Sequence, residues 1–246
     1  MSAAPAPRYL AAGESALVVE FGAKIDPAIH HRVLALDAAL SKANIGGVIE
    51  TVPTYRSLMI HFDPRRWPME ELVAAIARLE EAPRLALELR RRWHIPACYE
   101  PPFAEDIDLV ASALGLSAAR AAELHATARY RVYMYGFAPG FLFLGGLPQA
   151  LNFPRRPMPR APVPAGALLI AGGQALIASC PMPTGWYMLG RTPVKMFAPR
   201  RDPIFLMGIG DEVCFEQIGG SAFRELTEAA EAADYYPRCE CVDDRA

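Results

Sequence analysis

The segment YMYGFAPGFLFLGGLP, residues 133–148, decides the fold class of the longer part of this chain. It combines apolar and aromatic residues with closely spaced Gly and Pro, which force the backbone into turns. The same pattern of short apolar runs bounded by Gly or Pro recurs in this part of the chain, at Arg131–Tyr135, Leu168–Ala171, Ala175–Ser179, Trp186–Leu189, Val194–Phe197, Ile204–Met207 and Glu212–Ile218. Such runs are typical of strands, and many short strands predict a β-barrel.

The charge pattern of this region is one-sided. Between Ala126 and Arg201 there is no Asp or Glu, but there are nine cations: Arg129, Arg131, Arg155, Arg156, Arg160, Arg191, Lys195, Arg200 and Arg201. This imbalance predicts a site for an anion. Acid–base catalysis on an amide-like bond usually uses a carboxylate or a histidine, and Mg–nucleotide sites use carboxylate oxygens. The region is short of such groups, so we expect the chain to work with a partner.

The first hundred residues predict a different architecture. The expected order is a strand at Ala16–Phe21, a helix opened by Asp26 and Pro27, strands at Val48–Val52 and Ser57–Phe62, a helix opened by Pro68, and a strand at Ala86–Ile95. Asp26 fits the N-cap and Pro27 the first helical position. The order strand, helix, strand, strand, helix, strand is that of ferredoxin-like domains.

The remaining segments complete the domain plan. Asp106–Leu114 and Ser117–Ala128 are predicted as short helices that precede the barrel, and Ser221–Ala233 as an amphipathic helix that follows it. The sequence thus predicts an α+β protein with a ferredoxin-like α/β domain at 1–96, a β-barrel domain with leading helices at 97–233, and a loose polar tail at 234–246.

Composition excludes several classes of protein. The formal charge of −2 argues against a general nucleic-acid binder, because phosphates demand a basic excess that only the middle of the chain shows. No run of about 18 apolar residues predicts a membrane span, so we expect a cytoplasmic protein. The five cysteines are an odd number without the spacing of a disulfide framework. Cys239 and Cys241 form a pair without a second Cys or His pair nearby, so no metal site is predicted.

Several motifs together resemble one known family. They are WHIPACY (93–99), GLS (115–117), LH (124–125), YMYGFAPGFLFLGGLP (133–148), PRRPMPRAPVPAG (154–166), IAGGQ (170–174), GWYMLGRTP (185–193) and GDEVCF (210–215). This combination resembles the B subunits of 5-oxoprolinase, a family also known as KipI or allophanate hydrolase subunit 1 (AHS1). The resemblance covers nearly the whole chain and implies that the predicted barrel is a cyclophilin-like β-barrel.

The resemblance also implies a function. Such a chain would be one component of an ATP-dependent 5-oxoprolinase, with ATP and Mg²⁺ used by the assembled complex to cleave 5-oxoproline to glutamate. Its implied partners are a second cyclophilin-like protein of the KipA type and a protein of the LamB/YcsF type, and the isolated chain is expected to be inactive. Two alternatives stay open: a carboxyltransferase-like component of the urea carboxylase type, and a regulatory protein that inhibits a sensor histidine kinase.

Three arginines on family motifs are the predicted anion-binding residues. Arg155 and Arg160 flank Pro157 and Pro159 in a stiff loop, and Arg191 follows an apolar run. A guanidinium can grip a carboxylate or a phosphate with two hydrogen bonds. The alternative for each is an ordinary surface arginine.

Two further residues are predicted to take part in catalysis. Gln174 can donate and accept hydrogen bonds at once, which suits recognition of an amide. The alternative for Gln174 is a side chain that stabilises a turn. His125 has an ordinary pKa near neutrality and precedes the barrel, which suits proton transfer. The alternative for His125 is a helix cap.

The long connection from Gly136 to Pro164 contains the last predicted group. Connections of this length are usually functional or disordered, and its aromatic content argues against disorder. Phe137, Pro139 and Phe141 are predicted to form the apolar wall of a ligand pocket or the interface with a partner protein. The alternative for these residues is the barrel core.

Overall fold

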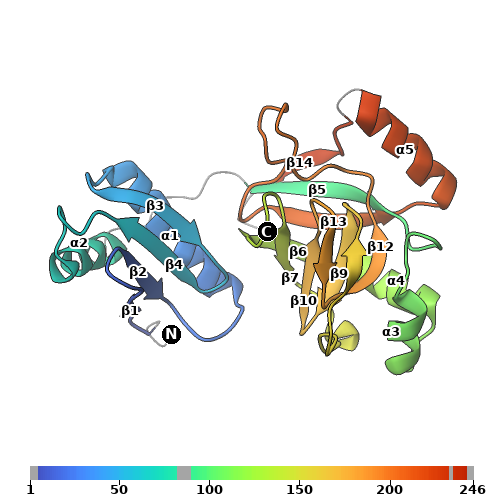
Figure 1. The fold of residues 1–246 in the computed structure, drawn as a ribbon, viewed down its shortest axis with the longest axis horizontal. Coiled ribbons are helices and arrows are strands. Elements are labelled where there is room, and N and C mark those ends of the chain that lie inside the picture. The colour runs from blue at the N-terminus through green and yellow to red at the C-terminus, as the bar shows by residue number, and fades with distance from the viewer. Residues whose placement is uncertain (1–4, 82–89, 233–234, 243–246) are drawn as a thin grey trace. The chain divides into compact units, whose positions relative to one another are not determined.

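The chain divides into two compact units, Met1–Glu88 and Leu89–Ala246. The computed structural model describes residues 5–81, 90–232 and 235–242 (Figure 1). The sequence placed the boundary between residues 96 and 97, within the motif WHIPACY. The structure places it earlier because β5 (Arg90–Ala97) pairs with strands β13 and β14 of the second unit.

The first unit is a four-stranded antiparallel sheet with two helices. The strand order is β1-β2-β4-β3, and the bounds are β1 Arg8–Ala11, β2 Ala16–Glu20, β3 Val48–Pro53, β4 Ser57–Phe62, α1 Pro27–Ala43 and α2 Met69–Glu81. The predicted cap of α1 is confirmed, since the Asp26 carboxylate accepts hydrogen bonds from the N–H groups of Ala28 (2.7 Å) and Ile29 (3.3 Å). Val33, Leu36 and Leu40 on one face of α1 are buried against β2 and β4.

The ferredoxin-like description of this unit is not confirmed. Of the strand predicted at Ala86–Ile95, residues 86–89 lie outside the described residues, and the rest belongs to the second unit. The outer strand beside β2 is β1, which the sequence analysis missed. Most of β1 is exposed, so it lacks the alternation of apolar and polar residues by which a half-buried strand is recognised.

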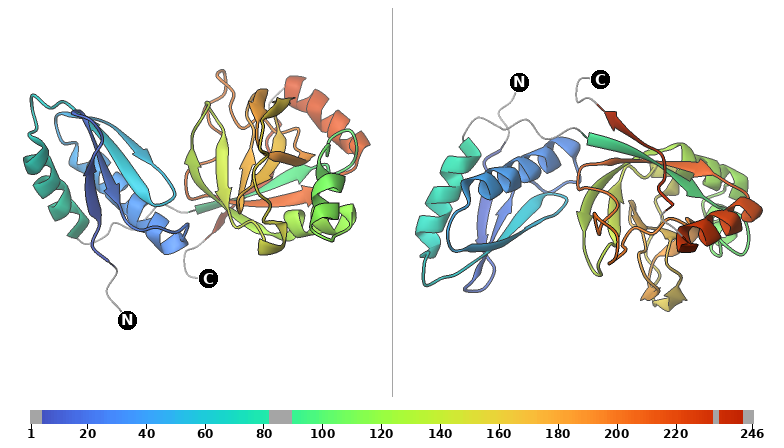
Figure 2. Two further views of the ribbon diagram at one scale, coloured as in Figure 1. Left: turned by 60° about the horizontal axis from the view of Figure 1, so that its bottom comes forward. Right: turned by 90° about the horizontal axis from the view of Figure 1, so that it is seen from above.

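The second unit contains an eight-stranded mixed sheet. Its order is β12-β9-β10-β7-β6-β13-β5-β14, in which only β5 and β13 are parallel. A separate ribbon pairs β8 with β11, and Figure 2 shows the helices α3 and α4 side by side against the sheet. The bounds are β6 Arg129–Tyr135, β7 Leu142–Gly145, β8 Arg160–Val163, β9 Ala167–Ala171, β10 Gln174–Ile177, β11 Met182–Thr184, β12 Tyr187–Arg191, β13 Glu212–Gln217, β14 Cys239–Val242, α3 Ile107–Ala113, α4 Ala118–Thr127, α5 Gly220–Ala232 and the short 3₁₀ helix Gln149–Leu151.

The predicted cyclophilin-like barrel is not confirmed. Across the described residues this sheet is open, with β12 and β14 at its edges. The end of β12 is joined to the residue that follows β5 by one bridge, in which Cys98 and Arg191 exchange backbone hydrogen bonds of 2.8 and 2.9 Å. The predicted strands Val194–Phe197 and Ile204–Met207 do not form ladder strands. They are joined by one bridge between Phe197 and Phe205.

Both faces of the strands around β9 are buried, which explains why their sequences are continuous apolar runs. Leu168 and Ile170 pack into a large core with α3 and α4, whereas Leu169 packs into a smaller core with Phe141 and Trp186 on the opposite face. Burial of each such side chain contributes about 1.5–3 kcal/mol. The sheet is therefore a rigid base for the loops at its ends.

The tail predicted to be loose is partly ordered. Residues Cys239–Val242 form β14 at the edge of the sheet beside β5. Glu240 accepts a hydrogen bond from the Arg92 guanidinium (3.4 Å) and also contacts the His94 ring (3.0 Å). Cys239 and Cys241 are exposed. Within the part of the chain that the structure describes, no helix is long and apolar enough to cross a membrane.

Candidate functional site

Apart from His125, the predicted site residues lie at two opposite ends of the sheet formed by β12, β9 and β10. Gln174 pairs with Ala171 at one end of β9, and Arg191 pairs with Ala167 at the other end. With a rise of about 3.3 Å per residue, these two ends of β9 are roughly 13 Å apart. Arg155 and Arg160 lie near the Gln174 end, whereas Phe137, Pro139 and Phe141 lie at the Arg191 end, where Ala178 also binds the backbone of Ala167.

The first end is organised by Asp106, a buried carboxylate just before α3. One oxygen accepts a hydrogen bond from Nη2 of Arg156 (2.5 Å). The other accepts from Nη1 of Arg160 (2.9 Å) and from the backbone N–H of Met188 (2.8 Å). The Arg156 guanidinium also lies 4.2 Å from the centre of the Tyr187 ring. Asp106 thus joins α3, the Arg-rich loop (residues 153–160) and β12.

This arrangement changes the interpretation of Arg160. Its guanidinium is paired with Glu105 as well as with Asp106. Burial lowers the pKa of Arg160, but the hydrogen bonds and charges of Glu105 and Asp106 outweigh burial and raise it. The charge of Arg160 is therefore compensated within the chain. Sequence analysis missed Asp106 and Arg156 as a pair, because these residues are far apart in sequence and Asp106 lies outside the acid-free stretch.

Arg155 and Gln174 lie near this cluster. Arg155 is exposed, and a Cβ atom placed on Gly185 would lie 3.4 Å from its Nη2. Gln174 is half-buried and begins β10 directly after a turn in which Gly172 and Gly173 have φ angles of 56° and 77°. The N–H of Gly172 donates to the carbonyl of Phe153 (2.7 Å), so the turn lies against the Arg-rich loop.

Arg191, at the second end, has a different environment. Its Nε donates to the carbonyl of Ala165 (2.9 Å), and its guanidinium lies 5.5 Å from the centre of the Phe223 ring. Burial lowers the pKa of Arg191. Among the described residues, no carboxylate forms an ion pair with it. The backbone bridge to Cys98 fixes the position of Arg191. Because no described carboxylate pairs with it, Arg191 presents an uncompensated, half-buried charge.

The second end also carries the aromatic loop, residues 136–141. Phe137 has a φ of 69°, a left-handed conformation that bulky residues rarely adopt, and 73% of its surface is exposed. Its ring lies 5.6 Å from that of Phe141, which is buried in the smaller core. The Ser179 hydroxyl donates to the carbonyl of Pro139 (2.5 Å). Strained backbone and exposed aromatic surface are typical of functional contacts.

His125 lies in the interior of the second unit, and burial lowers its pKa to about 3. Its Nδ1 is 2.8 Å from the Tyr99 hydroxyl, and its ring stacks on Phe215 at 5.0 Å. The hydroxyl of Tyr130 donates to the backbone carbonyl of His125 (3.0 Å). An enclosed imidazole with a lowered pKa gives no support to the predicted proton transfer, which stays a prediction.

Comparison with known proteins identifies the family. Residues 7–207 match the family described as carboxyltransferase domain, subdomain C and D. The B subunit of 5-oxoprolinase from Bacillus subtilis (strain 168) is 33% identical over 88% of this chain and 95% of that protein. The protein of the same name from Escherichia coli O157:H7 is 35% identical over 82% of this chain and 92% of that protein.

Solved structures agree with this assignment. The structure of TTHA0988 is 38% identical with a TM-score of 0.74, and the match covers 83% of this chain and 40% of that chain. The urea carboxylase of Kluyveromyces lactis shares the fold alone, with 17% identity and a TM-score of 0.81 over 96% of this chain and 24% of that chain. The chain therefore belongs to the KipI family of 5-oxoprolinase B subunits, and its residues 7–207 correspond to carboxyltransferase subdomains C and D.

Proposed function

We propose that this chain is the B subunit of an ATP-dependent 5-oxoprolinase, which cleaves 5-oxo-L-proline to L-glutamate, and that it is inactive without its partners. The observation that carries the proposal is the match along 95% of a relative named as the B subunit of 5-oxoprolinase. The proposed partners are a cyclophilin-like protein of the KipA type and a protein of the LamB/YcsF type, in a cytoplasmic complex.

The proposed role of Arg191 is to bind the carboxylate of 5-oxoproline. A half-buried guanidinium without a carboxylate partner can form charge-assisted hydrogen bonds that are stronger than those of an exposed arginine. The ring amide is a poor electrophile, and transfer of a phosphoryl group from ATP to its oxygen would make the ring carbon easier to attack. Arginine also suits stabilisation of the charge that develops during such a step.

The described residues form no closed protein cage for a metal ion. Magnesium bound to a nucleotide is held by carboxylate oxygens and water. Within residues 5–81, 90–232 and 235–242, no group of three or more His, Cys, Asp and Glu side chains is placed to hold a metal ion. The proposed contribution of this chain is substrate binding through Arg191, while ATP and Mg²⁺ are used by the assembled complex.

The aromatic loop is the proposed contact with a partner protein. Phe137 is 73% exposed, and Ile204 and Phe205 on a neighbouring loop are 45% and 40% exposed. The two loops adjoin, because Gly140 packs on Phe197, which forms a bridge with Phe205. In TTHA0988 the matching region is joined to further sequence, since this chain corresponds to 40% of it. That arrangement supports a further domain or protein next to this one.

Reconstitution tests the proposal. Glutamate release from 5-oxoproline and ATP would be measured for this chain alone, for the KipA-type and LamB/YcsF-type partners without it, and for all three together. Activity is expected only in the complete mixture. If the assembled complex of well-folded proteins releases no glutamate, the proposed function is wrong.

Substitution then tests the role of Arg191. In the active mixture, Arg191→Gln should reduce kcat/KM about tenfold or more, as expected for loss of a charge-assisted hydrogen bond of about 1.5–3 kcal/mol. The matched control is Arg200→Gln, which removes an exposed cation from the same acid-free stretch. Normal turnover of the Arg191 variant would remove this residue from the site, and loss of assembly would place it at an interface instead.

A further inference from the structure

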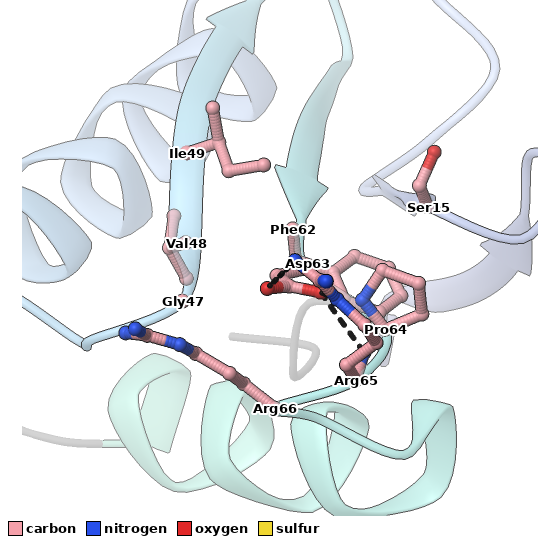
Figure 3. Close-up of a pocket in the computed structure, with 9 residues that line it drawn as sticks. All are labelled: Ser15, Gly47, Val48, Ile49, Phe62, Asp63, Pro64, Arg65 and Arg66. Atoms are coloured by element: carbon pink, nitrogen blue, oxygen red, sulfur yellow. Dashed lines mark hydrogen bonds and ion pairs between the residues drawn. The ribbon is translucent and has the colours of Figure 1, made fainter.

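The first unit contains a pocket of about 460 Å³, between the start of β3, the end of β4 and the loop that leads to α2 (Figure 3). Its walls include Val48, Ile49, Phe62 and Pro64, and its rim includes Arg65 and Arg66. Sites for small molecules usually have volumes of about 300–1,000 Å³, with apolar walls and a few polar groups. The pocket has both features.

The apolar wall depends on a β-bulge at Ile49. Val48 pairs with Phe62 and Glu50 with His61, so Ile49 is an extra residue without a partner on β4. As a result, 72% of Ile49 is exposed, although the residue belongs to a strand. Bulges of this kind redirect side chains and are frequent beside functional sites. An isoleucine held in this position offers contact surface for an apolar ligand.

The floor and one rim of the pocket are fixed. Phe62 is buried, and its backbone N–H donates to the carbonyl of Ser15 (3.0 Å). The indole N–H of Trp67 donates to the carbonyl of Gly46 (2.8 Å). Gly47 has a φ of 103°, and a Cβ atom there would lie 2.8 Å from the Trp67 ring. The shape of the pocket is therefore largely preformed.

The charges at the rim leave one cation uncompensated. Both oxygens of Asp63 accept hydrogen bonds from the guanidinium of Arg65, each at 3.1 Å. No hydrogen bond or ion pair joins the Arg66 side chain to another described residue. In Figure 3 the Arg66 side chain extends along the pocket towards Gly47 and Val48. Hydrogen bonds from Arg65, together with the charges of Arg65 and Arg66, lower the pKa of Asp63, so the carboxylate offsets only one of the two cations and the pocket keeps one net positive charge.

We propose that this pocket binds a small carboxylate with an apolar body. The apolar part would lie against Ile49, Phe62 and Pro64, and the carboxylate would bind Arg66. The inference does not depend on the proposed function, because every residue of the pocket lies in the first unit and none belongs to the site around Arg191.

The test is a titration of the full chain followed by ¹H–¹⁵N NMR. Hexanoate is the probe, hexanamide presents the same apolar body without charge, and acetate presents the charge without the body. Hexanoate should shift the backbone amides of residues 47–49 and 62–66 saturably, except Pro64, and bind more tightly than either control compound. Arg66→Gln should weaken hexanoate binding about three- to tenfold, which corresponds to roughly 0.7–1.4 kcal/mol, and leave hexanamide binding unchanged.

Matched variants separate this pocket from general charge effects. Arg78→Gln removes an arginine from α2 that does not line the pocket, and this variant should bind hexanoate as the unchanged chain does. Ile49→Thr should weaken hexanoate and hexanamide alike. Equal affinity for acetate and hexanoate, an Arg66→Gln variant with unaltered affinity, or the absence of saturable shifts at residues 47–49 would each overturn the proposal.

Discussion

Asp106→Asn is the most informative substitution for the stability of the second unit. It removes the negative charge that faces Arg156 and Arg160, and it places an amide N–H₂ opposite groups that are themselves donors. Removal of one partner of a buried ion pair costs about 3–5 kcal/mol. Both guanidinium side chains keep 21% of their surface exposed, so water compensates in part and the lower end applies, about 3 kcal/mol.

Calorimetry of the whole chain measures this loss. For a unit of this size, about 3 kcal/mol lowers Tm by roughly 6–12 °C. The transition of the first unit should not move, because Asp106 lies in the second. Asp108→Asn is the matched control, since Asp108 is exposed in the first turn of α3, and its effect should stay within about 0.5 kcal/mol. Equal Tm values for the two variants would refute the assignment of Asp106 as the residue that holds this end together.

Three further outcomes are expected. Because burial lowers the pKa of His125 to about 3 while the unfolded chain keeps about 6.5, the unfolded state binds the extra proton below pH 6.5. As the pH falls from 6.5 towards 3, the stability of the second unit should therefore decrease by about 1.4 kcal/mol per pH unit. In His125→Gln the free energy of unfolding, measured by denaturant titration at several pH values, should depend less steeply on pH. Phe137→Gly should leave the free energy of unfolding equal or higher, because it removes a left-handed phenylalanine, yet weaken binding to the partner proteins in size-exclusion chromatography; unchanged assembly would contradict the proposed contact. Gly166→Ala places a Cβ atom 2.1 Å from the Thr192 carbonyl oxygen, whereas Gly172→Ala meets nothing within 4 Å, so thermal unfolding should show a much larger loss for the first than for the second; equal losses would mean that backbone conformation alone matters.

Local signals in the sequence were sufficient for many elements. The capping carboxylate of Asp26 and the hydroxyl of Ser117, which accepts from the N–H of Arg120 (3.2 Å), mark helix starts that the structure confirms. Short apolar runs correctly indicated β6, β9, β10 and β12. These features depend on residues close together in sequence, so the sequence alone contains the information.

Local signals of this kind do not predict which distant segments of the chain pair with one another. Residues 90–95 of the run that ends at Ile95 were correctly predicted to be extended, but nothing in them indicates that their partners are β13 and β14. For the same reason the excess of arginine suggested an external anion, whereas Asp106 compensates two of these charges internally. His125 shows the same limit, because its type suggests proton transfer and only the structure reveals that the side chain is buried.

The position of β5 has a consequence for how the second unit is made. β5 opens this unit, yet its neighbours in the sheet are β13, at Glu212–Gln217, and β14, at Cys239–Val242. During synthesis, β5 leaves the ribosome long before either neighbour exists, so its backbone N–H and C=O groups have no partner strand until β13 and β14 are made. Long-range pairings of this kind slow folding and leave strand edges open to other chains. The vulnerable period of this protein is therefore the interval between translation of β5 and translation of β13, when chaperones or partner proteins would protect it most.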